Sequence, residues 1–135
     1  MTLSPTVLEA KRFEIFACKQ NTSLREACRQ IASEDISCLA VTDRDGYLSG
    51  ILTRADLLRA RLEHEDWLER PVDEYMNRNV VTVTPEATLL DVARLLTEHH
   101  IHRVIITRPE NDKHLPLGVL SDSDLIYHLA YQIGF

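Results

Sequence analysis

The sequence predicts an α/β (α+β) protein built of two β-α-β-β-α units packed with pseudo-two-fold symmetry. Three observations support this fold. Residues 21–31 align with residues 86–96 at an offset of 65, which also carries residues 39–42 onto residues 104–107. Residues 50–57 align with residues 118–125 at an offset of 68. Each half also shows the same order of β-branched runs and of apolar residues at helical spacing.

The first unit begins with a short apolar strand near residues 16–18, followed by a helix over residues 23–33 with helical apolar spacing. A β-branched run at residues 39–42 predicts the second strand. The sequence Asp43-Arg-Asp-Gly46 predicts a hairpin turn, because glycine adopts backbone conformations that tight turns need. A strand over residues 47–52 and a closing helix over residues 54–65 complete the unit.

The second unit repeats this order, with strands at residues 80–83, 104–107 and 115–120 and helices at residues 88–99 and 122–131. Its loop at residues 108–116 is three residues longer than the corresponding turn of the first unit. A charged stretch around Trp67 and the break at Pro71 separate the units. Since a unit of about 60 residues buries too little apolar surface to be comfortably stable alone, we expect the two units to pack together.

Composition restricts the function. With 44% apolar and 27% charged residues the chain is globular. Its net charge of −6 disfavours binding to nucleic acid or anionic lipid. No apolar run approaches the roughly 20 residues of a membrane span, and charged residues from Glu9 onward interrupt any signal peptide. We therefore expect a cytoplasmic protein that binds neither nucleic acid nor membrane.

Two motifs stand at the expected strand-to-helix turns, Gly50-Ile-Leu-Thr-Arg-Ala-Asp56 and Gly118-Val-Leu-Ser-Asp-Ser-Asp124. They resemble the G-h-h-[S/T]-x-x-D motif of the cystathionine β-synthase (CBS) domain family, whose paired form is the Bateman module. Pro71-Val-Asp-Glu-Tyr-Met76 resembles the entry segment of the family. Ile101-His-Arg-Val104 is similar to a strand of these domains in the regulatory γ subunit of AMP-activated protein kinase. The resemblance implies an N-terminal segment (1–12), a first CBS domain (13–65), a linker (66–71) and a second CBS domain (72–135).

The resemblance also implies a ribonucleotide ligand, most often an adenine nucleotide. A helix N-terminus favours a phosphate, a hydroxyl adds a donor, and a carboxylate accepts hydrogen bonds from ribose hydroxyls. In the kinase subunit the matching His-Arg pair contacts phosphates, and the corresponding residues of the first half line the base and ribose end of the pocket completed by the other half. The candidate ligand-binding residues are Thr53, Asp56, Ser121, Asp124, His102, Arg103, Ser37 and Cys38. Because Arg54 favours an anion and Asp122 opposes one, we expect two sites of unequal affinity.

Helix capping offers a simpler explanation of the same motifs. Thr53 with Asp56, and Ser121 with Asp124, have the spacing of a capping box. The other two helices begin with the same pattern, at Ser23 with Glu26 and at Thr88 with Asp91, where the family binds no ligand. Capping does not exclude a second role for the hydroxyl and the carboxylate, so both explanations remain open.

Neither a metal site nor a catalytic site is predicted. His99, His100 and His102 lack convincing ligand spacing, since neighbours on a helix diverge by about 100°. Cys18, Cys28 and Cys38 are odd in number, lack C-x-x-C spacing and are expected to be mostly buried thiols. No residue outside the repeated motifs has the partners of a nucleophile or a base. We therefore expect no enzyme activity and no required cofactor.

The leading hypothesis is a stand-alone regulatory module. It binds AMP, ADP, ATP or S-adenosylmethionine as a regulatory ligand, forms a homodimer and modulates an unidentified effector protein. Such modulation requires that the ligand has different affinities for two arrangements of the halves or of the subunits. The alternative is a dimerisation or interaction module with empty clefts and no ligand. Its support is the closing helix at residues 125–133, which is more apolar than a solvated helix requires. The residues leave the nucleotide, the effector, the dimer arrangement and the role of residues 1–12 open.

Overall fold

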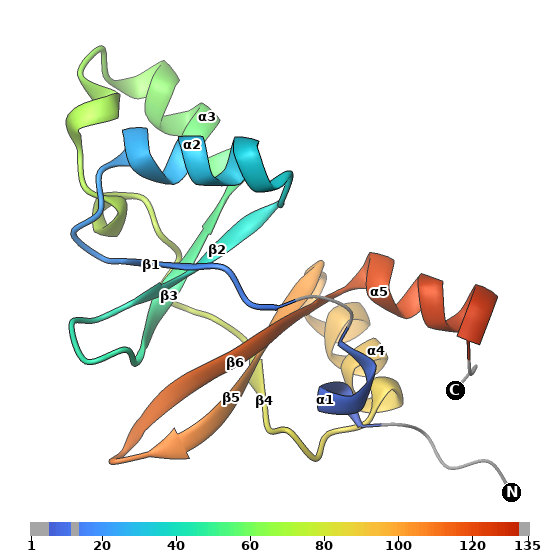
Figure 1. Ribbon diagram of the computed structural model, residues 1–135. Coiled ribbons are helices and arrows are strands. Elements are labelled where there is room, and N and C mark those ends of the chain that lie inside the picture. Colours follow the sequence, from blue (N-terminus) through green and yellow to red (C-terminus); the bar gives the residue numbers. More distant parts are fainter. Residues whose placement is uncertain (1–5, 12–13, 133–135) are drawn as a thin grey trace, which may run out of the picture. The chain divides into compact units, whose positions relative to one another are not determined.

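A computed structural model describes residues 6–11 and 14–132 of the chain. The chain forms two compact units. Phe16–Val80 make up one, called here the first-repeat unit, whereas Met1–Ile15 and Val81–Phe135 together make up the other, the second-repeat unit. Each unit contains the predicted order of strand, helix, strand, strand and helix, so the two-repeat α/β fold is confirmed (Figure 1).

The first-repeat unit is a three-stranded mixed sheet covered by two helices. Its strand order is β1-β2-β3, with β1 parallel and β3 antiparallel to β2. Two short 3-10 turns, η1 and η2, follow the closing helix. The elements are β1 (Ala17–Lys19), α2 (Leu24–Glu34), β2 (Cys38–Thr42), β3 (Leu48–Thr53), α3 (Arg54–Glu63), η1 (Trp67–Glu69) and η2 (Val72–Glu74).

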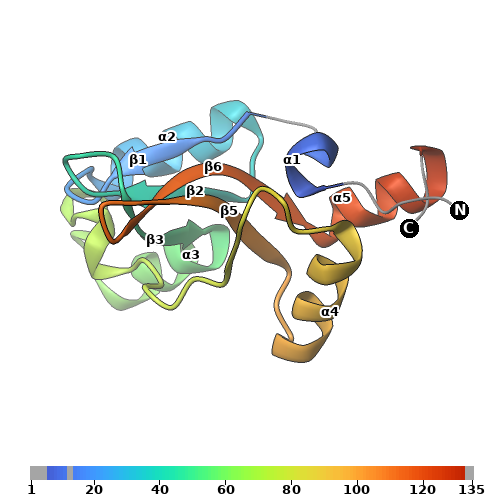
Figure 2. The same ribbon diagram turned by 90° about the horizontal axis from the view of Figure 1, so that it is seen from below.

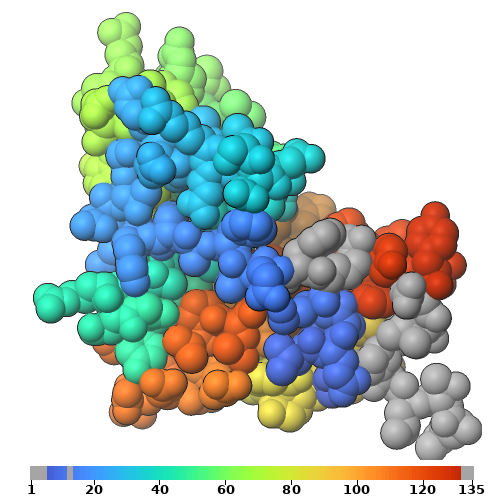
Figure 3. Space-filling model, in the orientation of Figure 1, coloured from blue at the N-terminus to red at the C-terminus, as the bar shows by residue number. Residues whose placement is uncertain are grey.

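Apolar residues on one face of α2 form the core with the central strand. Leu24, Ala27 and Ile31 are buried on α2, and every residue of β2 is buried. The helix begins at Ser23, whose hydroxyl accepts from the amide of Glu26, and ends where Asp35 adopts the left-handed conformation (φ 51°). The space-filling view shows side chains of α2 and of the segment after α3 side by side, which closes this core on one face (Figure 3).

The second-repeat unit has the equivalent sheet, β4-β5-β6, and adds a short helix from the N-terminal segment. Its core includes residues of α1, α4 and all three strands. The closing helix passes into a π-helical turn, labelled η3. The elements are α1 (Val7–Ala10), β4 (Thr82–Val83), α4 (Leu89–His99), β5 (Arg103–Glu110), β6 (Lys113–Ser121), α5 (Asp122–Tyr127) and η3 (His128–Gln132).

The prediction of a long loop at residues 108–116 is wrong. The hydrogen-bonded hairpin of β5 and β6 continues as far as the pairing of Glu110 with Lys113, and both views show it as a long two-stranded ribbon (Figure 2). Asn111 and Asp112 form the turn with φ values of 52° and 61°, a conformation that these two residue types tolerate well in two-residue hairpins. The charged residues and the two prolines on these arms hide the strand pattern; Pro109 is exposed and Pro116 is half-buried.

Residues 6–11 and residues 71–76 have equivalent roles. The amide of Val7 donates to the carbonyl of Ala87 (2.8 Å), and the amide of Val72 donates to the carbonyl of Thr22 (2.8 Å). Both pairs are related by the repeat offset, since 72 − 7 and 87 − 22 are each 65. The entry segment before each repeat therefore belongs to the core of the unit formed by the other repeat, which gives the N-terminal segment a structural role.

Gly50 permits a close backbone approach within the first-repeat unit. Ile51 and Asn77 exchange two backbone hydrogen bonds of 3.0 and 2.9 Å, which brings the chain after η2 against β3. A Cβ at Gly50 would lie 2.8 Å from the carbonyl oxygen of Asn77 and 2.9 Å from Sδ of Met76. At Gly118, the equivalent position, the nearest atom is the flexible end of Lys11 at 3.0 Å.

We predict that Gly50→Ala destabilises the protein by about 1–3 kcal/mol, because the carbonyl it meets is backbone and must shift. Gly118→Ala is the matched control and is expected to cost less, since a lysine side chain can move aside. Urea unfolding of both variants measures the difference. An equal or larger loss at Gly118 would contradict the proposed backbone contact.

Candidate functional site

The turn from β3 to α3 holds a buried carboxylate. Oδ2 of Asp56 accepts hydrogen bonds from the backbone amide (2.8 Å) and the hydroxyl (3.0 Å) of Thr53. The Asp56 amide in turn points to the Thr53 hydroxyl at 3.4 Å, which completes a capping box. Asp56 is only 8% exposed, although it lies in the first turn of a helix that carries several exposed charges.

The turn from β6 to α5 repeats this geometry. Oδ2 of Asp124 accepts from the amide (2.8 Å) and the hydroxyl (3.0 Å) of Ser121, and Asp124 is 7% exposed. The Ser121 hydroxyl also lies 2.8 Å from that of Ser123. The two motifs that carry the sequence resemblance therefore form the same local arrangement in the two units.

The capping explanation is confirmed for these two helices and for α4. Thr88 and Asp91 form a third capping box, and hydrogen bonds from Thr88 lower the pKa of Asp91. Ser23 accepts from the Glu26 amide at 3.2 Å. Asp91 differs from Asp56 and Asp124 in one respect: it is exposed. Burial of the carboxylate thus distinguishes the two motif turns from the cap of α4.

The strand that precedes each hairpin places its first residues beside the motif turn. In the first-repeat unit, Cys38 pairs with Thr53, and the carbonyl of Ser37 accepts from the Arg54 amide at 3.3 Å. In the second-repeat unit, Arg103 pairs with Ser121. The eight candidate residues therefore gather into two equivalent groups, one in each unit.

Neighbouring ion pairs alter the charges that the sequence places at these turns. The Arg54 guanidinium donates to the carbonyl of Ile36 (3.1 Å) and lies 3.4 Å from Oδ1 of Asp35. His102, whose side chain is 76% exposed, places Nδ1 3.1 Å from Oδ2 of Asp122. Arg54 is thus paired with a carboxylate of its own unit, and Asp122 lies beside an imidazole of its own unit.

Arg103 is the candidate whose polar atoms are least satisfied. Its Nε is buried and has no hydrogen-bond partner among the described residues. A buried donor of this kind costs free energy unless a partner is supplied. The start of β5 therefore holds a buried guanidinium donor whose hydrogen-bonding capacity is unused among the described residues.

Arg59 belongs to the first-repeat site but was not among the predicted residues. Its Nη1 lies 3.2 Å from Oδ1 of Asp56, and its Nη2 donates to the carbonyl of Tyr75 (3.4 Å). The i, i+3 spacing from Asp56 was the available signal, although such pairs are common on helix surfaces. Tyr127 stands at the equivalent position of the second repeat.

The described residues also bear on metal binding, membrane insertion and thiol reactivity. No group of three or more histidines, cysteines, aspartates or glutamates is positioned for a metal ion within residues 6–11 and 14–132. None of the helices in these ranges has both the length and the apolar character required to cross a membrane. Cys18 is buried, and burial raises its thiol pKa to about 11.

The repeats and their turns define a tandem α/β domain protein. Comparison with known families identifies the domain: the CBS domain model matches residues 10–63 and again residues 72–131. The chain therefore belongs to the CBS domain family and contains a pair of these domains.

Individual relatives agree with this assignment. The transcriptional repressor CcpN of Bacillus subtilis is 33% identical over 96 residues, which are 70% of this chain and 45% of the repressor. The first curated relatives are longer proteins, of which this chain spans 46%, 45% and 36%. An uncharacterized conserved protein from Pyrococcus horikoshii has a TM-score of 0.79 and 25% identity, with 100% of this chain and 99% of that chain covered.

A further solved structure has the same fold. The CBS domain pair of protein MJ0100 has a TM-score of 0.80 and 22% identity, with 92% of this chain and 94% of that chain covered. That pair was solved in complex with 5′-methylthioadenosine and S-adenosyl-L-methionine.

We predict that Cys18 reacts slowly with iodoacetamide at about pH 8, because only the thiolate is nucleophilic and a pKa of about 11 keeps the folded thiol protonated. Trypsin separates the three cysteines at Lys19, Arg25 and Arg29, so mass spectrometry can follow each one. In denaturant Cys18 should react quickly. Equal rates in the folded and unfolded chain would contradict the protective burial.

Proposed function

We propose that this CBS pair is a regulatory module that binds an adenosine ligand, AMP, ADP, ATP or S-adenosylmethionine, and modulates an effector protein. The observation that carries the proposal is the buried carboxylate at each motif turn. At each aspartate the capping bonds use only Oδ2, so Oδ1 is the oxygen to which a ligand would donate, at Asp56 in competition with Arg59. Two adjacent ribose hydroxyls are suitable donors to such a carboxylate.

The remaining candidates supply complementary contacts. Thr53 and Ser121 stand at the helix starts, where the helix dipole favours a phosphate or another anionic group; each hydroxyl donates its proton to the aspartate of its own turn. Arg103 adds a cationic group beside the Ser121 turn, and His102 adds an imidazole. In the first-repeat unit Ser37 and Cys38 occupy the equivalent positions and offer no cation, so the two sites should differ in affinity for charged ligands.

The solved pair of protein MJ0100 supports an adenosine ligand, because a fold of this kind accommodates 5′-methylthioadenosine and S-adenosyl-L-methionine there. A regulatory role follows from ligand binding if the ligand has different affinities for two arrangements of the protein. The proposal includes no catalytic step. It also includes a homodimer, argued below from exposed apolar residues.

We predict that one adenosine ligand stabilises the parent protein against heat, and that Asp56→Ala or Asp124→Ala removes this effect at the site with the higher affinity. At about 100 times its dissociation constant, a ligand specific for the folded state stabilises by about 2.7 kcal/mol. Thermal unfolding with AMP, ADP, ATP, S-adenosylmethionine, GMP and GTP measures the response.

Asp91→Ala is the matched control for this experiment. It removes the same capping arrangement from α4, at an exposed carboxylate that has no proposed ligand. The control should melt earlier than the parent yet keep the full ligand response. If the parent responds to none of the six ligands, the aspartates act only as caps and the proposed function is wrong.

A second candidate function, dimerisation or interaction without a ligand, rests on apolar residues that face solvent. On α3, Leu58 and Leu62 are 67% and 85% exposed. On α5 and η3, Ile126, Leu129 and Tyr131 are 62%, 52% and 77% exposed. Such residues in two closing helices favour association with another apolar surface, and the dimer is expected with or without a ligand.

We predict that the double variant Leu62→Asp/Leu129→Asp is monomeric, because each new carboxylate would have to be desolvated in a dimer. Light scattering coupled to size-exclusion chromatography measures the mass. Leu90→Asp, at a 41% exposed leucine on α4, is the control and should leave the parent's mass unchanged. A monomeric parent would exclude the homodimer.

A further inference from the structure

Arg59 is held in place on two sides. Its guanidinium pairs with Asp56 through Nη1 (3.2 Å) and donates to the Tyr75 carbonyl through Nη2 (3.4 Å). Cζ of Arg59 lies 5.2 Å from the centre of the Tyr75 ring, within the range of a cation–π contact. Tyr75 is itself 7% exposed, and its hydroxyl donates to Glu63 (2.8 Å). The arginine is therefore preorganised against the Asp56 carboxylate by the segment that follows η2.

The acceptor positions of Asp56 are then nearly all in use. A carboxylate offers about four lone-pair positions on its two oxygens. Thr53 occupies two of them at Oδ2, and Arg59 occupies one at Oδ1. A ribose with both hydroxyls free donates two hydrogen bonds. It can make both to Asp56 only if Arg59 moves away.

In the second-repeat unit, one residue contacts the entry segment and another caps the turn. Its entry segment is also tied to the closing helix, because Nε2 of His128 donates to the carbonyl of Ala10 (2.6 Å). Tyr127 stands three residues after Asp124, at the position equivalent to Arg59. The closing helix and its π-helical turn thus contact the entry segment through His128 and cap the motif turn through Asp124.

We propose that Arg59 determines the ligand preference of the first-repeat site by competing with the ribose diol for Asp56. This inference rests on the proposed function and deepens it. The first-repeat site discriminates against ligands that present both free ribose hydroxyls. Arg59 acts as a specificity-determining residue of this site.

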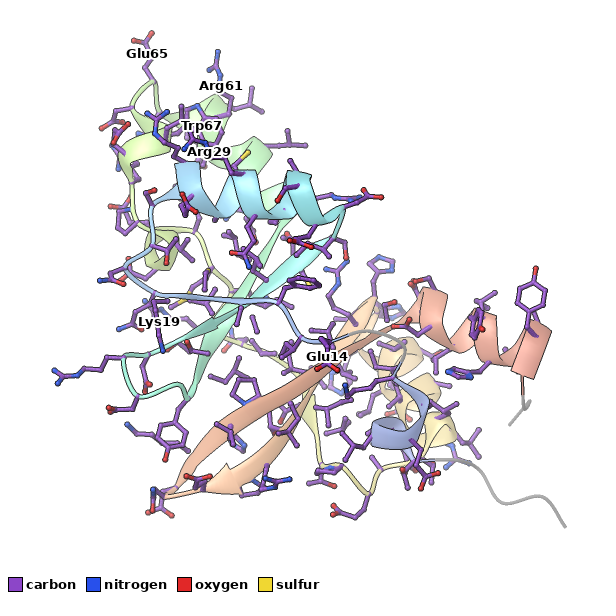
Figure 4. All side chains as sticks on the ribbon, in the orientation of Figure 1. Glu14, Lys19, Arg29, Arg61, Glu65 and Trp67 are labelled. Carbon is purple, nitrogen blue, oxygen red and sulfur yellow. The ribbon has the colours of Figure 1, made fainter. Side chains whose placement is uncertain are left out.

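Isothermal titration calorimetry tests the competition with two probes, AMP and its 2′,3′-dideoxy analogue, which lacks the hydroxyls that would displace Arg59. The Asp124→Asn background removes the second-repeat site. Within it, Arg59→Met keeps the apolar stem and removes the guanidinium, and Arg59→Lys keeps a positive charge. Arg61→Met is the matched control, since Arg61 is exposed on the same helix, points outward and has no ion pair within the described part of the chain (Figure 4). Thermal unfolding verifies that each variant is folded.

The expected result is that Arg59→Met raises affinity for AMP by about threefold to tenfold over the background, as loss of one competing ion pair predicts, and leaves affinity for the dideoxy analogue unchanged. Arg59→Lys should give a smaller rise and Arg61→Met none. Three results would overturn the role of Arg59 but leave the proposed function standing. They are equal changes in affinity for both probes, no change in affinity, or AMP binding by the protein with Asp124 intact but by none of the Asp124→Asn variants. If no protein in the series, the parent included, binds either probe, the proposed function fails and the role of Arg59 fails with it.

Discussion

A carboxylate that is removed from water must be surrounded by hydrogen-bond donors, and this requirement shapes both motif turns. Asp56 and Asp124 meet it with the amide and hydroxyl of the residue three positions earlier. The same bonds begin α3 and α5 directly at the end of a strand. The strand must therefore stop where the hydroxyl residue stands, which positions the first residues of β2 and β5 beside the carboxylate.

The same constraint leaves room for divergence between the repeats. Capping uses one carboxylate oxygen, so the residue that pairs with the other oxygen can change without loss of the fold. In the first repeat that oxygen faces Arg59, which also donates to the carbonyl of Tyr75 in the entry segment. In the second repeat His128 holds the entry segment instead. Position three after the aspartate thus differs between the repeats, arginine in one and tyrosine in the other, while the capping arrangement of the turn is the same.

Most of the fold was predictable, because an internal repeat doubles every signal of periodicity. The buried strands, the two amphipathic helices and all four helix starts depend on local patterns that the sequence displays directly. The inner parts of β5 and β6 are predicted, but the outer part of their hairpin is not, since its prolines and charges lack the alternation of a half-buried strand. The docking of residues 6–11 was missed for another reason: each entry segment joins the unit of the other repeat, a long-range contact without a local pattern.

The candidate site was predictable to the extent that its members share a motif. The hydroxyl and carboxylate positions come from the sequence alone, and the strands bring the candidates at the start of β2 and β5 to them. Arg59 could not be predicted in this way, because its position at the site depends on Tyr75, sixteen residues away, and on which carboxylate oxygen the cap does not use. A cap and a ligand site can coexist on one aspartate when they use different oxygens. If an adenosine ligand binds here as proposed, the residue at the second oxygen tunes its binding, and this residue can change between repeats while the bonds of the cap are kept.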